Sequence, residues 1–356
     1  MLRRGNSHEP LGSTAEPQAD RQPSSARPHR SRVNTIIDLA VSMSFILGLL
    51  WLSFFYQLKV NVPPVEASPF DRRSMYFSVV QPEPGVLWAV GSAGRIIRSE
   101  DAGKNWKIQA TKTNEVLEAI VSWNGNDAVA AGDNGTILRT ADGGAHWGKI
   151  DVEMRPEAKL ILAGVVLPQT GRALLVGEFG TILASDDRGL TWRHTYPQED
   201  VAWHTVSVGP DGRIWVVGEF GRVVVSDDGG NSWTKLTSPA EATLTSIAFT
   251  QSGEAVVAGL SGAAFRSADK GMTWQAIHLP GSEHVFALAA VDDAVMAFGG
   301  EGGVYRLAPS AGAWTRETVR PAIQGFVVSV IAEKTGLILA GSAVGELDNG
   351  TWRAFR

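Results

Sequence analysis

Carboxylate, hydroxyl and indole side chains occur within eight residues in the stretch SDDRGLTW, from Ser185 to Trp192. Such groups could bind a ligand, take part in hydrolysis, or hold the backbone of a turn. The stretch recurs as SEDAGKNW, TADGGAHW, SDDGGNSW and SADKGMTW, with two degenerate copies, LAPSAGAW and ELDNGTW. The tryptophans that end them are separated by 41, 45, 41, 41, 40 and 38 residues. This regular period is typical of a repeated structural unit rather than of a single catalytic centre.

The five well-preserved copies suit a turn. The aspartate at their third position can accept hydrogen bonds from backbone N–H groups of its own turn. The glycine two residues later tolerates a positive φ, and the tryptophan has a large apolar area that can pack between neighbouring units. We therefore assign structural roles to Asp101, Asp142, Asp187, Asp228, Asp269, Trp106, Trp147, Trp192, Trp233 and Trp274.

A pair of glycines precedes each tryptophan, as in VGSAG and VGEFG. Short segments rich in small and β-branched residues surround the pairs, such as TLTSIAFT, EAVVAG and AAFRSA, and one more follows each tryptophan. Four short strands about every 40 residues are typical of one blade of a β-propeller. The sequence predicts an all-β fold over residues 75–356, a seven-bladed β-propeller. Six blades are the alternative if a degenerate unit does not form.

The pattern S-x-D-x-G-x-T-W resembles the Asp-box, also called the bacterial neuraminidase repeat. Together with VG-x-x-G-x-I upstream, seven units and an apolar N-terminal segment, it makes residues 75–356 resemble the photosystem II stability/assembly factor family of propellers. The resemblance implies an assembly or accessory factor for a membrane protein complex. In bacteria without a photosystem that complex must be another one, such as an exporter. The partner-binding residues of the family do not map onto this sequence.

The alternative function is an envelope-facing, sialidase-like glycoside hydrolase or a carbohydrate-binding propeller, because sialidases also carry Asp-boxes. The arginine-bearing RIP motif of sialidases is absent, and the chain has four tyrosines to supply a nucleophile. No two of the seven histidines have metal-ligand spacing. We predict no catalytic residue, no metal site and no cofactor. The net charge of −5 and the lack of a basic run in the propeller argue against nucleic acid as a partner.

The N-terminal region divides into three segments. Residues 1–35 are rich in Pro, Ser and Arg and predict a disordered cytoplasmic tail. Residues 36–56 are apolar and, as a helix of about 1.5 Å rise per residue, long enough to span a bilayer. Arginines precede the span, so the positive-inside rule predicts a single-pass protein of the bacterial inner membrane with a periplasmic propeller. Residues 57–74 are a linker or closing segment, and a cleaved signal peptide is the alternative.

Two sets of residues are candidates for partner contacts. Ala40, Ser44 and Gly48 share one helix face, and small residues at this spacing allow close helix–helix contact in lipid. The second set lies between the glycine pairs, which we expect on the face that also carries the blade-to-blade connections, opposite the Asp-boxes. Exposed aromatic side chains there, with acids beside them, would suit a basic partner segment; alternatively, each Phe packs on its neighbouring turn. These candidates are Glu178, Phe179, Glu219, Phe220, Glu301 and Asp133. If they do not bind, the blade-connecting loops 155–159 and 198–204 are the next candidates.

Overall fold

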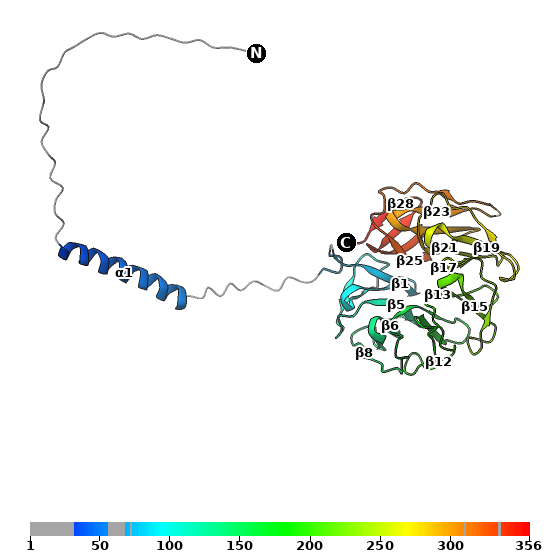
Figure 1. The fold of residues 1–356 in the computed structure, drawn as a ribbon, viewed down its shortest axis with the longest axis horizontal. Helices are drawn as coiled ribbons and strands as arrows, with labels where there is room; N and C mark the ends of the chain where they lie inside the picture. Colours follow the sequence, from blue (N-terminus) through cyan, green and yellow to red (C-terminus); the bar gives the residue numbers. More distant parts are fainter. Residues whose placement is uncertain (1–31, 56–67, 72, 310, 334–335) are drawn as a thin grey trace, which may run out of the picture. The chain divides into compact units, whose positions relative to one another are not determined.

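The computed structural model describes residues 32–55, 68–71, 73–309, 311–333 and 336–356. They belong to two units, 1–65 and 66–356, which we describe separately. The first unit contains helix α1, Arg32–Phe55 (Figure 1). This helix begins four residues before the predicted start because Arg32 to Thr35 contain neither glycine nor proline. The predicted tail up to residue 31, residue 56 and linker residues 57–67 lie outside the described residues.

The described residues of the second unit form seven antiparallel sheets of four consecutive strands each, which confirms the seven-bladed propeller (Figure 1). The six-bladed alternative is wrong, because both degenerate units form complete sheets. The first four blades are β1 Tyr76–Glu83, β2 Val86–Gly91, β3 Ile96–Ser99, β4 Lys107–Gln109; β5 Leu117–Ser122, β6 Ala128–Gly132, β7 Ile137–Thr140, β8 Gly148–Lys149; β9 Ile161–Val166, β10 Ala173–Gly177, β11 Ile182–Ser185, β12 Arg193–His194; and β13 Trp203–Val208, β14 Ile214–Gly218, β15 Val223–Ser226, β16 Thr234–Lys235. The last three are β17 Leu244–Phe249, β18 Ala255–Gly259, β19 Ala264–Ser267, β20 Gln275–Ala276; β21 Val285–Val291, β22 Ala294–Gly299, β23 Val304–Leu307, β24 Thr315–Arg316; and β25 Val327–Glu333, β26 Gly336–Gly341, β27 Gly345–Asp348, β28 Thr351–Ala354.

The glycine pairs form the hairpins between the second and third strands. Five of them contain one turn of 3-10 helix: η1 Ser92–Gly94, η2 Asp133–Gly135, η3 Glu219–Gly221, η4 Leu260–Gly262 and η5 Gly300–Gly302. The first glycine of a pair is required because the chain entering the blade crosses it closely. A Cβ at Gly91 would lie 1.8 Å from the Met75 carbonyl oxygen, and the equivalent distances in the other blades are 1.9–2.4 Å. Backbone contact of this kind leaves no room for a side chain.

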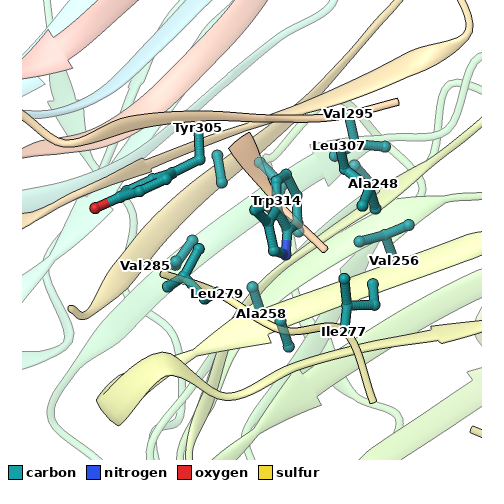
Figure 2. Packing of buried hydrophobic residues seen from close by; sticks show 13 residues of the cluster. Ala248, Val256, Ala258, Ile277, Leu279, Val285, Val295, Tyr305, Leu307 and Trp314 are labelled. Atoms are coloured by element: carbon teal, nitrogen blue, oxygen red, sulfur yellow. The ribbon is translucent and has the colours of Figure 1, made fainter. Parts of the chain in front are cut away.

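The core consists of apolar layers between neighbouring blades. Figure 2 shows the layer between the fifth and sixth blades, where Trp314 packs among Ala258, Ile277 and Leu279. The Asp-box tryptophans make the same kind of contact elsewhere. Trp147 of the second blade meets Trp88 of the first edge-to-face, with ring centroids 5.6 Å apart. Each Asp-box therefore packs against the blade before it.

Arginines link neighbouring blades on the side of the molecule that carries the Asp-boxes. Arg139 Nε of the second blade donates to the carbonyl of Arg188 in the third-blade Asp-box at 2.7 Å. Arg213 Nη1 of the fourth blade donates in the same way to the Lys270 carbonyl in the fifth at 3.3 Å. The other links are Arg98 to Gly125, Arg172 to Gly229 and Arg266 to Ala311. Each of the first five blades thus holds the backbone of the blade that follows it.

Side-chain contacts between the first and seventh blades complete the ring. Val79 N donates to Ser329 Oγ at 3.1 Å, and Gln81 Nε2 donates to Glu333 Oε1. Phe355 packs on the Trp106 ring, with centroids 5.6 Å apart. No strand of the described chain joins a sheet at the other end of the sequence.

Candidate functional site

The first strands of all seven blades line a central channel with a cavity of about 530 Å³. The second residue of each first strand contributes to its lining, and these residues form a mostly apolar set: Phe77, Glu118, Leu162, His204, Thr245, Phe286 and Val328. Burial raises the pKa of the Glu118 carboxyl to about 7, and the nearby Asp133 carboxylate adds to the effect. Burial lowers the pKa of His204. Sequence reasoning missed Glu118 and included His204 only as the end of the candidate loop 198–204, although aligning the repeats at this position would have found both.

The glycine-pair turns and the connections from fourth to first strands lie on one face, which we call the connection face. The second glycine of a pair donates its N–H to the connection leading to the next blade, as Gly180 N does to the Val201 carbonyl at 2.8 Å. The twelve residues inside the six two-residue pairs include four acids and no basic residue: Asp133, Glu178, Glu219 and Glu301 are the acids. The turns therefore give this face negative charge.

The two phenylalanines at these turns differ in exposure. Phe220 is 57% exposed, whereas Phe179 is half-buried. Both have φ near +50°, at 55° and 51°, a conformation that costs roughly 1 kcal/mol or more for a residue with a Cβ. The six turns all use this conformation, and Asn134, which tolerates it better, takes the equivalent position in the second blade. The fold therefore requires the turn but does not require a phenylalanine there.

The acids at these turns also bind backbone of their own blade-to-blade connections. Glu219 Oε2 accepts from Ala202 N at 2.9 Å, and Glu178 Oε2 accepts from Lys159 N at 3.4 Å. Glu301 is exposed and Asp133 is half-buried. Glu178 and Glu219 therefore support the fold and give charge to the face at the same time.

A group of charged residues lies between the third and fourth blades on the connection face. Arg155 Nη1 donates to the Phe179 carbonyl at 2.8 Å, and Glu199 N donates to the same oxygen at 3.4 Å. The Glu199 carboxylate pairs with Arg222 at 2.6 Å and with Lys235 at 2.9 Å. The sequence suggested the turns and the loops 155–159 and 198–204 as separate candidates. The structure brings parts of both loops against the Phe179 turn.

The Asp-box aspartates bond with donors of their own turns. One carboxylate oxygen accepts the N–H of the residue four positions later at 2.8–3.0 Å in all five boxes. In the fourth blade Ser232 and Ser226 also donate their hydroxyls to Asp228, at 2.6 and 2.7 Å. These hydrogen bonds lower the pKa of Asp101, Asp142 and Asp269 to about 2. Carboxylates held in this way suit turn formation and are poor proton acceptors near neutral pH.

The tyrosines of the propeller are poorly placed for nucleophilic catalysis. Tyr76, Tyr196 and Tyr305 are all buried, and burial raises the pKa of Tyr76 and of Tyr305 to about 12. Tyr76 donates to the Pro69 carbonyl, and Tyr196 donates to Glu199 at 2.8 Å. The fourth, Tyr56, is outside the described residues. In the part of the chain that the structure describes, no three His, Asp or Glu side chains are grouped as metal ligands.

Helix α1 is long and apolar enough to cross a membrane, although a signal sequence would meet the same criterion. Ser44 Oγ donates to the Ala40 carbonyl at 2.6 Å, so this hydroxyl is bonded within the helix. No atom lies within 4 Å of a Cβ placed on Gly48. Ala40, Ser44 and Gly48 are exposed in this unit.

The chain is similar to a family of known proteins and to several solved structures. The family described as photosynthesis system II assembly factor YCF48 matches residues 64–213 and 157–353. A solved structure described as YCF48 bound to D1 peptide superposes with a TM-score of 0.64 at 16% identity, covering 81% of this chain and 95% of that one. YCF48 from Cyanidioschyzon merolae gives 0.60 at 19% identity, with coverages of 75% and 92%.

An enzyme has a similar fold, the GH74 xyloglucanase from Xanthomonas campestris, with a TM-score of 0.64 at 16% identity. The match covers 78% of this chain and 54% of the xyloglucanase. No curated protein sequence matches. At these identities the structural likenesses show the fold alone, whereas the family match extends over most of the propeller. The chain therefore belongs to the photosynthesis system II assembly factor YCF48 family.

Proposed function

We propose that this protein is a non-catalytic, membrane-anchored propeller that assists the assembly or stability of an integral membrane protein complex, an exporter being one example. In this proposal α1 is an uncleaved anchor in the bacterial inner membrane, the N-terminus is cytoplasmic and the propeller is periplasmic. The length and apolar character of α1 and the arginines before it support this topology.

The observation that carries the proposal is the exposed Phe220 beside acidic turns on the connection face. The fold requires this strained turn but does not require an aromatic residue in it. An exposed aromatic ring at such a position is well suited to a protein–protein contact. Acids at four of the six turns favour a basic partner segment. A related propeller is described as bound to a D1 peptide, which supports binding of a segment of another protein.

The tyrosines and the Asp-box acids argue against a glycoside hydrolase. A sialidase-like mechanism needs a tyrosine that can reach its substrate and lose its proton. The described tyrosines are buried, and burial raises their pKa. The Asp-box acids, which could otherwise serve as general acids, are bonded within their turns.

A second contact is proposed within the membrane. Ala40, Ser44 and Gly48 lie along one face of α1, where a partner helix could approach closely. The Ser44 hydroxyl is bonded to the Ala40 carbonyl, so this face offers packing rather than a free donor.

Co-purification in mild detergent tests the partner contact. The tagged full-length chain should recover an integral membrane protein, and Phe220→Ala should reduce this recovery at least several-fold without loss of folded protein. Met272→Ala is the matched control, because Met272 is 72% exposed in the fifth-blade Asp-box on the other face. Equal recovery with both variants would show that Phe220 is not the contact.

Single cysteines test the topology, because the chain has none of its own. An impermeant maleimide should label Ser252→Cys in intact spheroplasts, but Ser7→Cys only after lysis. A purified chain that lacks residue 7 would show that α1 is a cleaved signal.

A further inference from the structure

The seventh blade lacks the Asp-box that each of the first five blades places against the blade before it. Its third and fourth strands, β27 and β28, are connected by a tight hairpin with Asn349 and Gly350 at φ of 46° and 75°. Seven residues separate the third strand from the fourth in each of the five Asp-box blades, whereas two residues separate β27 from β28, so this hairpin is shorter. The joint between the sixth and seventh blades therefore lacks the loop that packs against the preceding blade in the Asp-box joints.

Arg306 is the blade-linking arginine of this joint. It is the third residue of β23, the position that Arg98, Arg139 and Arg266 hold in β3, β7 and β19. Those three guanidinium groups each donate to a backbone carbonyl of the next blade. Among the described residues, the Arg306 guanidinium has neither a hydrogen bond nor an ion pair. The guanidinium is half-buried and lines the cavity described next, where no described residue accepts a hydrogen bond from it.

A cavity of about 530 Å³ occupies the place of the missing loop. Its apolar lining includes Met296, Leu337 and Leu347, which belong to the core between these two blades. Among the residues that the structure describes, its charged lining is one guanidinium and four carboxylates: Arg306, Asp292, Glu317, Glu333 and Asp348. The four carboxylates would therefore repel an anionic ligand, although the Arg306 guanidinium alone would attract one.

We propose that this cavity, the blade 6–7 groove, binds a turn of a partner protein in the way that Arg139 and Arg213 hold the Asp-box of the next blade. The bound turn presents a backbone carbonyl to Arg306 and an apolar side chain to Met296 and Leu337. The four carboxylates select a neutral or basic turn. The groove is on the face of the Asp-boxes, so this contact is independent of the one proposed for Phe220 on the connection face.

The fifth-blade Asp-box provides the probe. The blocked peptide of residues 267–274, SADKGMTW, has no net charge and contains the Lys270 carbonyl that Arg213 binds in the intact fold. It should bind the full-length chain in nanodiscs saturably, with one peptide per chain. Arg306→Gln should weaken binding about tenfold or more, because a charged hydrogen bond is lost. Arg316→Gln, in the adjacent strand and away from the cavity lining, is the control and should bind as wild type does.

A graft tests the location of the site. Replacing Asp348–Gly350 with residues 267–272 should fill the groove from within the chain, raise the melting temperature and abolish peptide binding. No saturable binding, equal affinity with Arg306→Gln, or native affinity in the graft would overturn the proposal. A dimer of the wild-type chain that Arg306→Gln dissociates would also overturn it, since the occupant would then be a second copy.

Discussion

Replacing Glu118 with glutamine should make the propeller more stable at high pH and leave it nearly unchanged at low pH. Burial raises the pKa of Glu118 from an ordinary value of 4.5 to about 7. The folded chain therefore binds more protons than the unfolded chain between pH 4.5 and 7, and its stability falls as the pH rises through this window. At about 1.36 kcal/mol per pKa unit, reduced for the solvent that reaches the channel, the charged carboxylate costs on the order of 2 kcal/mol.

The assay is the melting temperature of wild type and Glu118→Gln from pH 4 to pH 8. The two should melt together at pH 4, and the variant should melt roughly 5 °C higher at pH 8. Glu301→Gln removes an exposed carboxylate from the sixth-blade turn and should leave the pH profile of wild type unchanged. Parallel profiles for wild type and Glu118→Gln would refute the reasoning, because they would mean that Glu118 is solvated or paired in the folded chain.

Three further predictions concern the Asp-boxes and the anchor. The pKa of Asp-box acids such as Asp101 is lowered in the folded chain, so their stabilising effect is complete above pH 4 and is lost as the pH falls to 2. Tryptophan fluorescence should therefore report unfolding between pH 4 and pH 2. A chain that is still folded at pH 2 would contradict this prediction. Asp228→Ala should cost about 1–2 kcal/mol by analogy with lost helix caps, and Trp147→Ala about 3–5 kcal/mol because its ring is buried against Trp88, both measured by denaturant unfolding. In both variants, partner recovery should fall only in proportion to the loss of folded protein. A stable Asp228→Ala chain that does not bind its partner would overturn the assignment of the Asp-box as a structural turn. Replacing Ala40, Ser44 and Gly48 of α1 with leucine should leave membrane insertion intact and reduce partner recovery. Unchanged recovery would show that these residues do not form the contact.

Repeats made the fold predictable from the sequence. The Asp-box and the glycine pair each require particular residue types that other residues do not replace. Their period therefore revealed the blades without knowledge of packing. Gly91 shows why, since a Cβ there would meet the Met75 backbone at 1.8 Å. Degenerate units were harder to judge. The seventh blade forms its sheet with a short hairpin in place of an Asp-box.

The site was less predictable because it depends on differences between equivalent positions. Phe179 and Phe220 have the same sequence context, yet one is half-buried and the other mostly exposed. Their surroundings also differ through residues distant in sequence: Arg155 binds the Phe179 carbonyl from 24 residues away, whereas Ser238 binds the Phe220 carbonyl from 18 residues away. Glu118 is unremarkable in its own strand, and its high pKa depends on the channel formed by six other blades.

The way the ring closes has a consequence for how the chain can be rearranged. Every blade is a continuous segment, and the first and seventh are joined by contacts such as the hydrogen bond from the Val79 backbone N–H to Ser329 Oγ, which spans 250 residues of sequence. A propeller that shares strands between its ends can be cut at few places without breaking a sheet. Here each of the six connections between blades could serve as new termini, with a linker joining residues 356 and 68. Circular permutants opened at these connections should retain all seven sheets. In each permutant, the two blades at the new termini are no longer connected by the chain and are held together by noncovalent contacts alone. The same arrangement allows a blade to be duplicated or deleted as one unit of about 40 residues without dividing any sheet.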